Sequence, residues 1–178
     1  KNITSGLVFS SERVRRALKI PAIRKLRLLF ITHKERLLTQ AERAYADASN
    51  IEFRNCEFKC AYSGTSSYNN NLVINGNATS YSSGANNENI TVDSCTFNKG
   101  GYAACSNYGS SSSSRAPGFV FTNNTINNAG YYGVRMYYLD APQILGNNIS
   151  MASNGYAGIY MHYCLSSSTP PIRINRNI

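Results

Sequence analysis

The chain has 178 residues and a formal net charge of +9, and only 15% of its residues are charged, against about 25% in ordinary soluble domains. It contains no run of about 18 apolar residues, which excludes an apolar membrane-spanning helix. Polarity comes instead from uncharged residues, chiefly 22 Asn, 22 Ser and 13 Tyr.

The first ten residues form the beginning of a repeating pattern. Asn2-Ile-Thr-Ser-Gly-Leu-Val-Phe9 is a defective copy, one residue short, of a phrase that returns after residue 49. We therefore assign residues 1–10 to a first, partial coil of a repeat architecture. Because the sequence begins and ends inside a repeat, without a visible cap, we expect it to be an excerpt of a longer secreted protein.

Residues 12–46 differ from the rest of the chain. They hold ten Lys and Arg against three acids, so seven of the nine net charges lie here, and they contain no Asn or Gly. Thr32-x-x-Glu35 before Leu37 and Leu38 is typical of a capping box that opens an amphipathic helix. We interpret residues 11–48 either as a basic, helical insert or as a stretch that is not native coding sequence, for instance a local frame error. A functional basic helix for an anionic membrane or nucleic acid is a third interpretation.

The location of this charge changes the meaning of the basic isoelectric point. Outside residues 12–46 the chain carries a net charge of only +2. A basic patch that binds nucleic acid would be expected on the repeating part of the fold, which is nearly neutral. We therefore expect no nucleic-acid partner.

From residue 49 onward, one phrase recurs: apolar-x-apolar-x-x-(Cys/Asn)-x-apolar. Its key position, the Cys/Asn of the pattern, is occupied in turn by Cys56, Cys95, Asn124, Asn147 and Asn177, and by Leu7 in the defective copy. A second phrase, Gly133-Val-Arg-Met-Tyr-Tyr138, returns as Gly158-Ile-Tyr-Met-His-Tyr163. The alternation of apolar and polar residues predicts short strands with one buried face.

Stacking of these strands explains how such short repeats can be stable. One coil cannot bury its own apolar face, so successive coils stack about 4.8 Å apart and supply the core together. Asn at the key position is expected to tolerate the left-handed conformation of a turn, and Cys to fit there as a small buried group. We predict an all-β solenoid of about five to six coils over 1–10 and 49–178.

These phrases resemble those of the right-handed parallel β-helix proteins of the pectate-lyase-like superfamily. The resemblance implies a right-handed parallel β-helix in a secreted or cell-surface protein. It leaves function open, because the superfamily includes polysaccharide lyases, polygalacturonases, uronate epimerases, phage tailspikes and surface adhesins. Function must therefore be argued from the residues of a site.

Aligning the two Gly-containing phrases predicts such a site. Val134 and Met136 align with Ile159 and Met161, and all four side chains would point into the core. On the outer face Arg135 would lie beside Tyr160, and Tyr137 beside His162. This set suits β-elimination or epimerisation of a uronic acid, with Arg135 neutralising the substrate carboxylate and Tyr137, Tyr160 or His162 as base and acid. We predict these four as catalytic residues.

Three further residues complete the predicted site, as substrate-binding groups: Asp140, Tyr138 and Tyr163. The partner would be a polysaccharide or cell-surface glycan, and the protein a polysaccharide lyase or epimerase if it is an enzyme. The alternative is a non-catalytic surface adhesin, tail-fibre-like or structural module. Outward tyrosines can also simply cover a sheet face or bind glycan without chemistry.

The remaining polar residues give weaker signals. No two acids occupy matching outward positions of adjacent coils, which disfavours glycoside hydrolysis. Arg54 and Asp93 are expected to form a surface ion pair of little energetic weight. We find no cofactor motif and no acidic cluster for calcium, although calcium is not excluded. Cys56 and Cys95 are expected to stack as buried thiols, or as a disulfide in an oxidising compartment.

Overall fold

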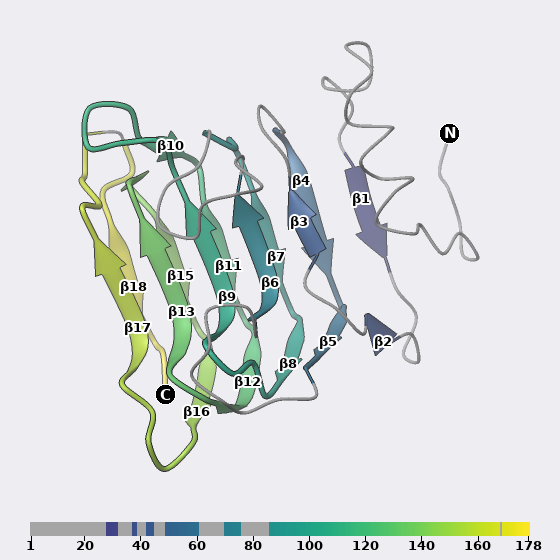
Figure 1. Cartoon of the computed structure of the whole chain (residues 1–178). Helices are drawn as coiled ribbons and strands as arrows, with labels where there is room; N and C mark the ends of the chain where they lie inside the picture. The colour runs from purple at the N-terminus through teal and green to yellow at the C-terminus, as the bar shows by residue number, and fades with distance from the viewer. Residues whose placement is uncertain are drawn as a thin grey trace.

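The computed structural model describes residues 28–31, 37–38, 42–44, 49–60, 70–75, 86–167 and 169–178. Figure 1 shows these residues as strands lying side by side, with β1 and β18 at opposite ends of the stack. No residue in these ranges is helical, so this part of the chain belongs to the all-β class, as the sequence predicts. The predicted first coil at 1–10 lies outside the described residues.

Eighteen strands make up the described structure. Their bounds are β1 (Leu28–Ile31), β2 (Leu37–Leu38), β3 (Glu42–Ala44), β4 (Ile51–Arg54), β5 (Glu57–Lys59), β6 (Asn70–Asn75), β7 (Thr91–Asp93), β8 (Thr96–Asn98), β9 (Ala103–Tyr108), β10 (Ala116–Pro117), β11 (Val120–Thr122), β12 (Thr125–Ala129), β13 (Tyr132–Tyr137), β14 (Leu139–Asp140), β15 (Gln143–Leu145), β16 (Asn148–Met151), β17 (Ala157–His162) and β18 (Arg173–Asn175).

Three parallel sheets hold most of these strands, and the chain visits them in a constant order. The first sheet has the order β1-β4-β7-β11-β15-β18, the second β16-β12-β8-β5-β2 and the third β17-β13-β9-β6-β3, while β10 and β14 form a small pair. We call each successive set of first-, second- and third-sheet strands a repeat. The five sets are β1–β3, β4–β6, β7–β9, β11–β13 and β15–β17.

Equivalent residues of successive repeats stand in register. In the first sheet Glu52 pairs with Thr91, Thr91 with Val120, Val120 with Gln143, and Gln143 with Arg173. This is the row that the recurring phrase predicts, so the alignment of the phrases is confirmed. The same side chain position is therefore occupied again at every step of about 4.8 Å along the stack.

The core is built from columns of apolar residues that repeat with the strands. Phe58 and Phe97 are register partners in the second sheet and stack with ring centroids 4.7 Å apart, and Phe121 of the first sheet packs across the core at 5.7 Å from Phe97. All three are fully buried. Burial of one such side chain contributes about 1.5–3 kcal/mol. Because each ring is covered by the repeats on either side, the core exists only when repeats stack.

The turns after β4, β7, β11, β15 and β18 each contain a left-handed residue, but not at the key position. The left-handed residue comes one position earlier, and its identity varies: Asn55, Ser94, Asn123, Gly146 and Arg176, with φ between 51° and 66°. We had expected the key Asn itself to take this conformation. The earlier residue makes the turn, which leaves the key side chain free to point into the core.

The key asparagines form a ladder of hydrogen bonds inside the core. Asn124 Nδ2 donates to the carbonyl of Val92 at 2.9 Å, and Asn124 Oδ1 accepts from the N–H of Cys95 at 2.8 Å. Asn147 makes the equivalent bonds to the repeat before it, and so does Asn177. Each buried amide thus satisfies its own polar atoms and two backbone groups of the preceding repeat, which ties the repeats together.

Three strands lie inside the segment 11–48, where a helical insert was expected. β1 pairs with β4 through Leu28 and Ile51, β2 with β5, and β3 with β6, so these strands form one more repeat on the stack. The helix expectation is therefore wrong at 28–31, 37–38 and 42–44. A capping box and helix propensity contribute only about 1–2 kcal/mol, which pairing with an available strand edge overrides. The rest of the predicted insert lies outside the described residues.

Replacing one ladder amide should destabilise the fold much more than replacing a surface amide. Asn124→Ala leaves the N–H of Cys95 and the carbonyl of Val92 without this partner inside the core, so we expect a loss of about 2–4 kcal/mol in the free energy of unfolding. Asn127→Ala is the control, because Asn127 is exposed and donates to Asn98 on the surface. Its cost should stay within about 0.5 kcal/mol. Equal costs in urea titration would show that the ladder does not stabilise the core.

Candidate functional site

Nine tyrosines and one histidine cover the outer face of the third sheet and the turns beside it. The core side of this sheet carries Cys105, Val134 and Met136, so the intervening positions face outward. We call the outward set the tyrosine wall: Tyr102, Tyr108, Tyr131, Tyr132, Tyr137, Tyr138, Tyr156, Tyr160, His162 and Tyr163. These residues are linked by ring contacts with centroids 4.0–6.2 Å apart.

The predicted pairing of the two Gly-containing phrases is confirmed. Arg135 is the register partner of Tyr160, and Tyr137 is the partner of His162. On the core side Val134 and Met136 are buried as predicted, with Ile159 and Met161 packed against the same core. The four predicted catalytic residues are therefore brought together on one face.

Arg135 is not exposed as the sequence led us to expect, because only 6% of its surface is accessible. Its guanidinium carbon lies 4.4 Å from the ring centroid of Tyr137 and 4.9 Å from that of Tyr102, and two further rings stand at 5.4 Å. Its Nη1 donates to the hydroxyl of Tyr108 at 2.6 Å and its Nη2 to the hydroxyl of Tyr137 at 2.9 Å. Arg135 thus binds the rings and hydroxyls of the tyrosine wall. A substrate carboxylate could not reach its guanidinium group without moving these rings.

The cation also affects the hydroxyls around it. Burial raises the pKa of Tyr108, while the neighbouring Arg135 acts in the opposite direction because a cation favours a phenolate. Two N–H groups and four ring faces replace the water that the guanidinium loses on burial. Such an arrangement holds the wall rigid and keeps its inner hydroxyls oriented.

The other three predicted catalytic residues are half-buried and adjoin one another. The rings of Tyr137 and His162 lie 4.8 Å apart at centroids, and those of Tyr160 and His162 lie 6.1 Å apart. A hydrogen bond with Tyr137 is the main cause that raises the pKa of Tyr160. The polar groups therefore run in sequence from the buried arginine through Tyr137 to Tyr160, with His162 beside them.

The predicted substrate-binding residues fall into two groups. Tyr138 and Tyr163 stack nearly parallel, with centroids 5.3 Å apart, at one margin of the wall. Asp140 is buried, and its Oδ1 accepts from the N–H of Ser167 at 2.8 Å. Asp140 therefore holds the turn after β17 in place, and its carboxylate is largely covered; its role in substrate binding stays a prediction.

A column of three tyrosines was missed at the other margin of the wall. Tyr102 stacks on Tyr131 at 5.9 Å and Tyr131 stacks on Tyr156 at 5.1 Å, with nearly parallel rings. Each of them follows a glycine and precedes a third-sheet strand, in the phrases 101–103, 130–132 and 155–157. This recurring Gly-Tyr pair is the sequence signal that could have identified the column.

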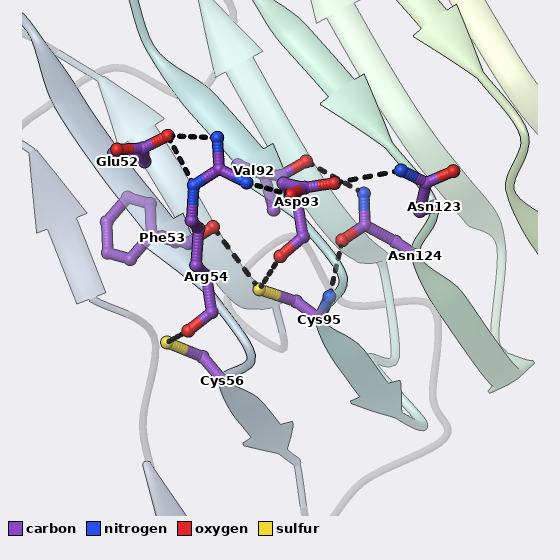
Figure 2. A network of polar contacts seen from close by, with 9 residues as sticks. All are labelled: Glu52, Phe53, Arg54, Cys56, Val92, Asp93, Cys95, Asn123 and Asn124. Carbon is purple, nitrogen blue, oxygen red and sulfur yellow. Dashed lines mark hydrogen bonds and ion pairs between the residues drawn. The ribbon is translucent and has the colours of Figure 1, made fainter. Parts of the chain in front are cut away.

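A second polar cluster lies on the outer face of the first sheet (Figure 2). Arg54 Nε donates to Glu52 at 2.5 Å, and Arg54 also forms the predicted ion pair with Asp93, which accepts from Asn123 at 3.1 Å. The hydrogen bond with Glu52 is the main cause that raises the pKa of Arg54. Arg54 thus holds two carboxylates on one face of the sheet. Glu52 on β4 and Asp93 on β7 lie at diagonal positions, so a comparison of directly opposite positions does not pair them. Both are neutralised by the same cation.

The described residues offer little to a metal ion. Within them, no group of three or more His, Cys, Asp or Glu side chains could coordinate one, so calcium has no cluster there. The described part of the chain also has no helix long and apolar enough to cross a membrane. Comparison with protein-family models, with curated proteins and with solved structures finds no match to this chain.

Replacing Arg135 by lysine should destabilise the fold although the charge is kept. Lysine lacks the planar fork that reaches the hydroxyls of Tyr108 and Tyr137 together, so we expect a loss of about 1–3 kcal/mol in the free energy of unfolding. Arg173→Lys is the control, because Arg173 is exposed on β18. A wild-type urea midpoint for the Arg135 variant would show that charge alone maintains the wall.

Proposed function

We propose that the protein is a right-handed parallel β-helix of the pectate-lyase-like kind that binds polysaccharide through its tyrosine wall, in a secreted or cell-surface location. The fold part of the proposal is supported by three parallel sheets visited in a constant order and by the phrases of the sequence. The binding part is supported by the wall itself. Aromatic rings and oriented hydroxyls are the groups that proteins commonly use against the apolar faces and hydroxyls of sugars.

The stacked rings of the wall support the binding function most directly. Tyr102, Tyr131 and Tyr156 form a column in which the middle ring has a tyrosine on each side, and Tyr138 and Tyr163 form a stacked pair. Tyr156 is 62% exposed and Tyr163 is 54% exposed. A sugar would pack against these two rings and bond to the hydroxyls beside them.

The spacing of the wall favours an extended chain of sugars. Columns advance by one strand spacing, about 4.8 Å, which is close to the length of one sugar unit in an extended glycan. A polysaccharide that runs along the stack would therefore meet the rings of Tyr102, Tyr131 and Tyr156 at successive sugars. This match favours a polymer over a free monosaccharide.

A polysaccharide lyase or uronate epimerase is the second candidate, and one contact favours it. Arg135 donates to the Tyr137 hydroxyl and so fixes its position next to His162, the arrangement that a base and an acid acting on one sugar would need. Tyr137 would then remove the C5 proton of a uronic acid, and His162 would protonate the leaving oxygen. Against this candidate, Arg135 is enclosed by rings and could not also neutralise the substrate carboxylate. We therefore place binding without chemistry first, as in an adhesin, tail-fibre-like or structural module.

Binding should depend on the exposed rings. We expect Tyr156→Ala and Tyr163→Ala each to weaken binding to the preferred polysaccharide by about tenfold or more, since an aromatic anchor is typically worth more than 1 kcal/mol. Leu165→Ala is the control, because Leu165 is also exposed and apolar but lies outside the wall. Affinity electrophoresis on a panel of neutral and acidic polysaccharides measures this. Absence of binding across the panel would contradict the proposal.

Catalysis is tested on the same panel by two signals. Lyase action raises the absorbance of unsaturated uronate, and epimerase action exchanges the C5 proton with deuterium from the solvent. If either signal appears, His162→Ala and Tyr137→Phe should lower its rate by about 10²–10⁴-fold, the range for loss of an acid or base. Binding without either signal would assign the wall to a non-catalytic module.

A further inference from the structure

The asparagine ladder changes its chemistry at one end of the described stack. Asn occupies the key position in three successive repeats, and Cys95 and Cys56 continue the same column. The two cysteines are 39 residues apart, whereas the later steps of the column are 29, 23 and 30 residues long. Among the key positions that the structure describes, thiols thus replace amides where the chain between two of them is longest.

Register places the two cysteines side by side. Arg54 pairs with Asp93 two residues before them, and Glu57 pairs with Thr96 directly after them. Neighbouring strands of a sheet lie about 4.8 Å apart, which falls within the range of about 4.4–6.8 Å between Cα atoms that a disulfide spans. The backbone therefore needs no rearrangement to allow a bond between Cys56 and Cys95.

The thiols occupy the inner side of the turn, among backbone carbonyls (Figure 2). Cys95 Sγ donates to the carbonyl of Phe53 at 3.5 Å, in the same way that Asn124 Nδ2 donates to Val92 one repeat later. Cys56 Sγ donates to the carbonyl of Arg54 at 3.3 Å. A thiol has no amide oxygen, so it cannot make the second bond of the ladder. Unlike an amide, it can join its neighbour covalently.

We propose that Cys56 and Cys95 form a disulfide when the protein folds in an oxidising compartment. This disulfide would cross-link the repeat β4–β6 to the repeat β7–β9. One thiolate attacks a sulfur of a small-molecule disulfide and releases one thiol. The second thiolate then attacks the mixed disulfide and releases the other thiol. Two cysteine thiols are oxidised, and the small disulfide is reduced to two thiols that take up the two protons. The structure described here is the reduced state, in which neither cysteine takes part in a disulfide.

The length of chain between Cys56 and Cys95 explains why a disulfide would stabilise the fold at this position. A cross-link stabilises a fold mainly by restricting the unfolded chain, and the effect grows with the length of the closed loop. The pair spans the longest step of the column, so the cross-link acts where ordering the chain costs most entropy. In the shorter steps, the hydrogen bonds of the amides tie the repeats instead.

The other three cysteines have no cysteine as a register neighbour. Cys105 pairs with Leu72 and Val134 in the third sheet. Cys60 follows the pair Lys59–Asn98, and Cys164 precedes the bridge between Asp140 and Leu165, so neither has a thiol beside it in register. One disulfide and three free thiols is therefore the expected state of an odd set of five.

The proposal is tested by refolding the full chain in a buffer of oxidised and reduced glutathione. Free thiols are then alkylated, and non-reduced peptides are mapped by mass spectrometry. We expect one cross-link, between the peptides that contain Cys56 and Cys95, and alkylation at the other three cysteines. Five alkylated cysteines, or a cross-link between any other pair, would overturn the proposal. This mapping uses the wild-type chain, so it does not depend on a variant that folds.

Variants and stability give a second measurement. Cys56→Ser and Cys95→Ser should each abolish the cross-link, while Cys105→Ser, the control at an equally buried thiol, should retain it. The oxidised wild-type chain should melt several degrees above the reduced chain, and Cys56→Ser should melt at the same temperature in both buffers. No difference for the wild-type chain, despite a mapped cross-link, would refute the stabilising role.

The rate of oxidation of the folded, reduced chain gives a third measurement. The hydrogen bond with Cys56 and burial raise the pKa of Cys95, and only the thiolate attacks a disulfide. The rate should therefore keep rising with pH beyond the range where an ordinary thiol is already ionised. A plateau near the ordinary thiol pKa would indicate that oxidation proceeds through an unfolded segment or at another cysteine.

Discussion

Parallel pairing in register is the constraint on which the rest of this structure depends. It places equivalent side chains of successive repeats directly above one another, about one strand spacing apart. At many positions, above all those that face the core, each residue therefore packs against, or bonds to, a similar residue of the next repeat. Phe58 stacks on Phe97, Asn124 bonds to Asn147, and Tyr138 stacks on Tyr163. The core, the ladder and the tyrosine wall are three results of the same rule.

Much of the fold could be predicted because this rule leaves a direct trace in the sequence. Equivalent positions repeat the same residue types, so the phrases around Cys95 and Asn124 align without any structure. The repeat formed by β1–β3 could not be found in this way. Leu28–Ile31 is an apolar run without the key Cys or Asn, and the surrounding charges and a local capping box indicated a helix. The capping signal is local, whereas a strand edge offers hydrogen bonds at every residue.

The sequence was enough to predict which residues of the site pair across the strands, but not how deeply each side chain is buried. The pairs Arg135–Tyr160 and Tyr137–His162 follow from aligning two phrases within the third sheet. Burial of Arg135 depends also on Tyr102 and on the turn residues before each strand, which belong to another repeating position. Burial of a long polar side chain is decided by all the rings that reach it, so a single aligned strand pair cannot reveal it.

The same rule accounts for the unusual composition. Two like charges about 4.8 Å apart repel by about 1–3 kcal/mol, depending on the effective dielectric constant, so a charged residue cannot recur in a column. An amide is donor and acceptor at once and can recur, and tyrosine can recur because its rings stack. Where charges do occur in register, they alternate in sign, as with Arg54 and Asp93. The wall thus presents rings and hydroxyls instead of rows of like charges, which is the surface that the proposed binding of polysaccharide would use.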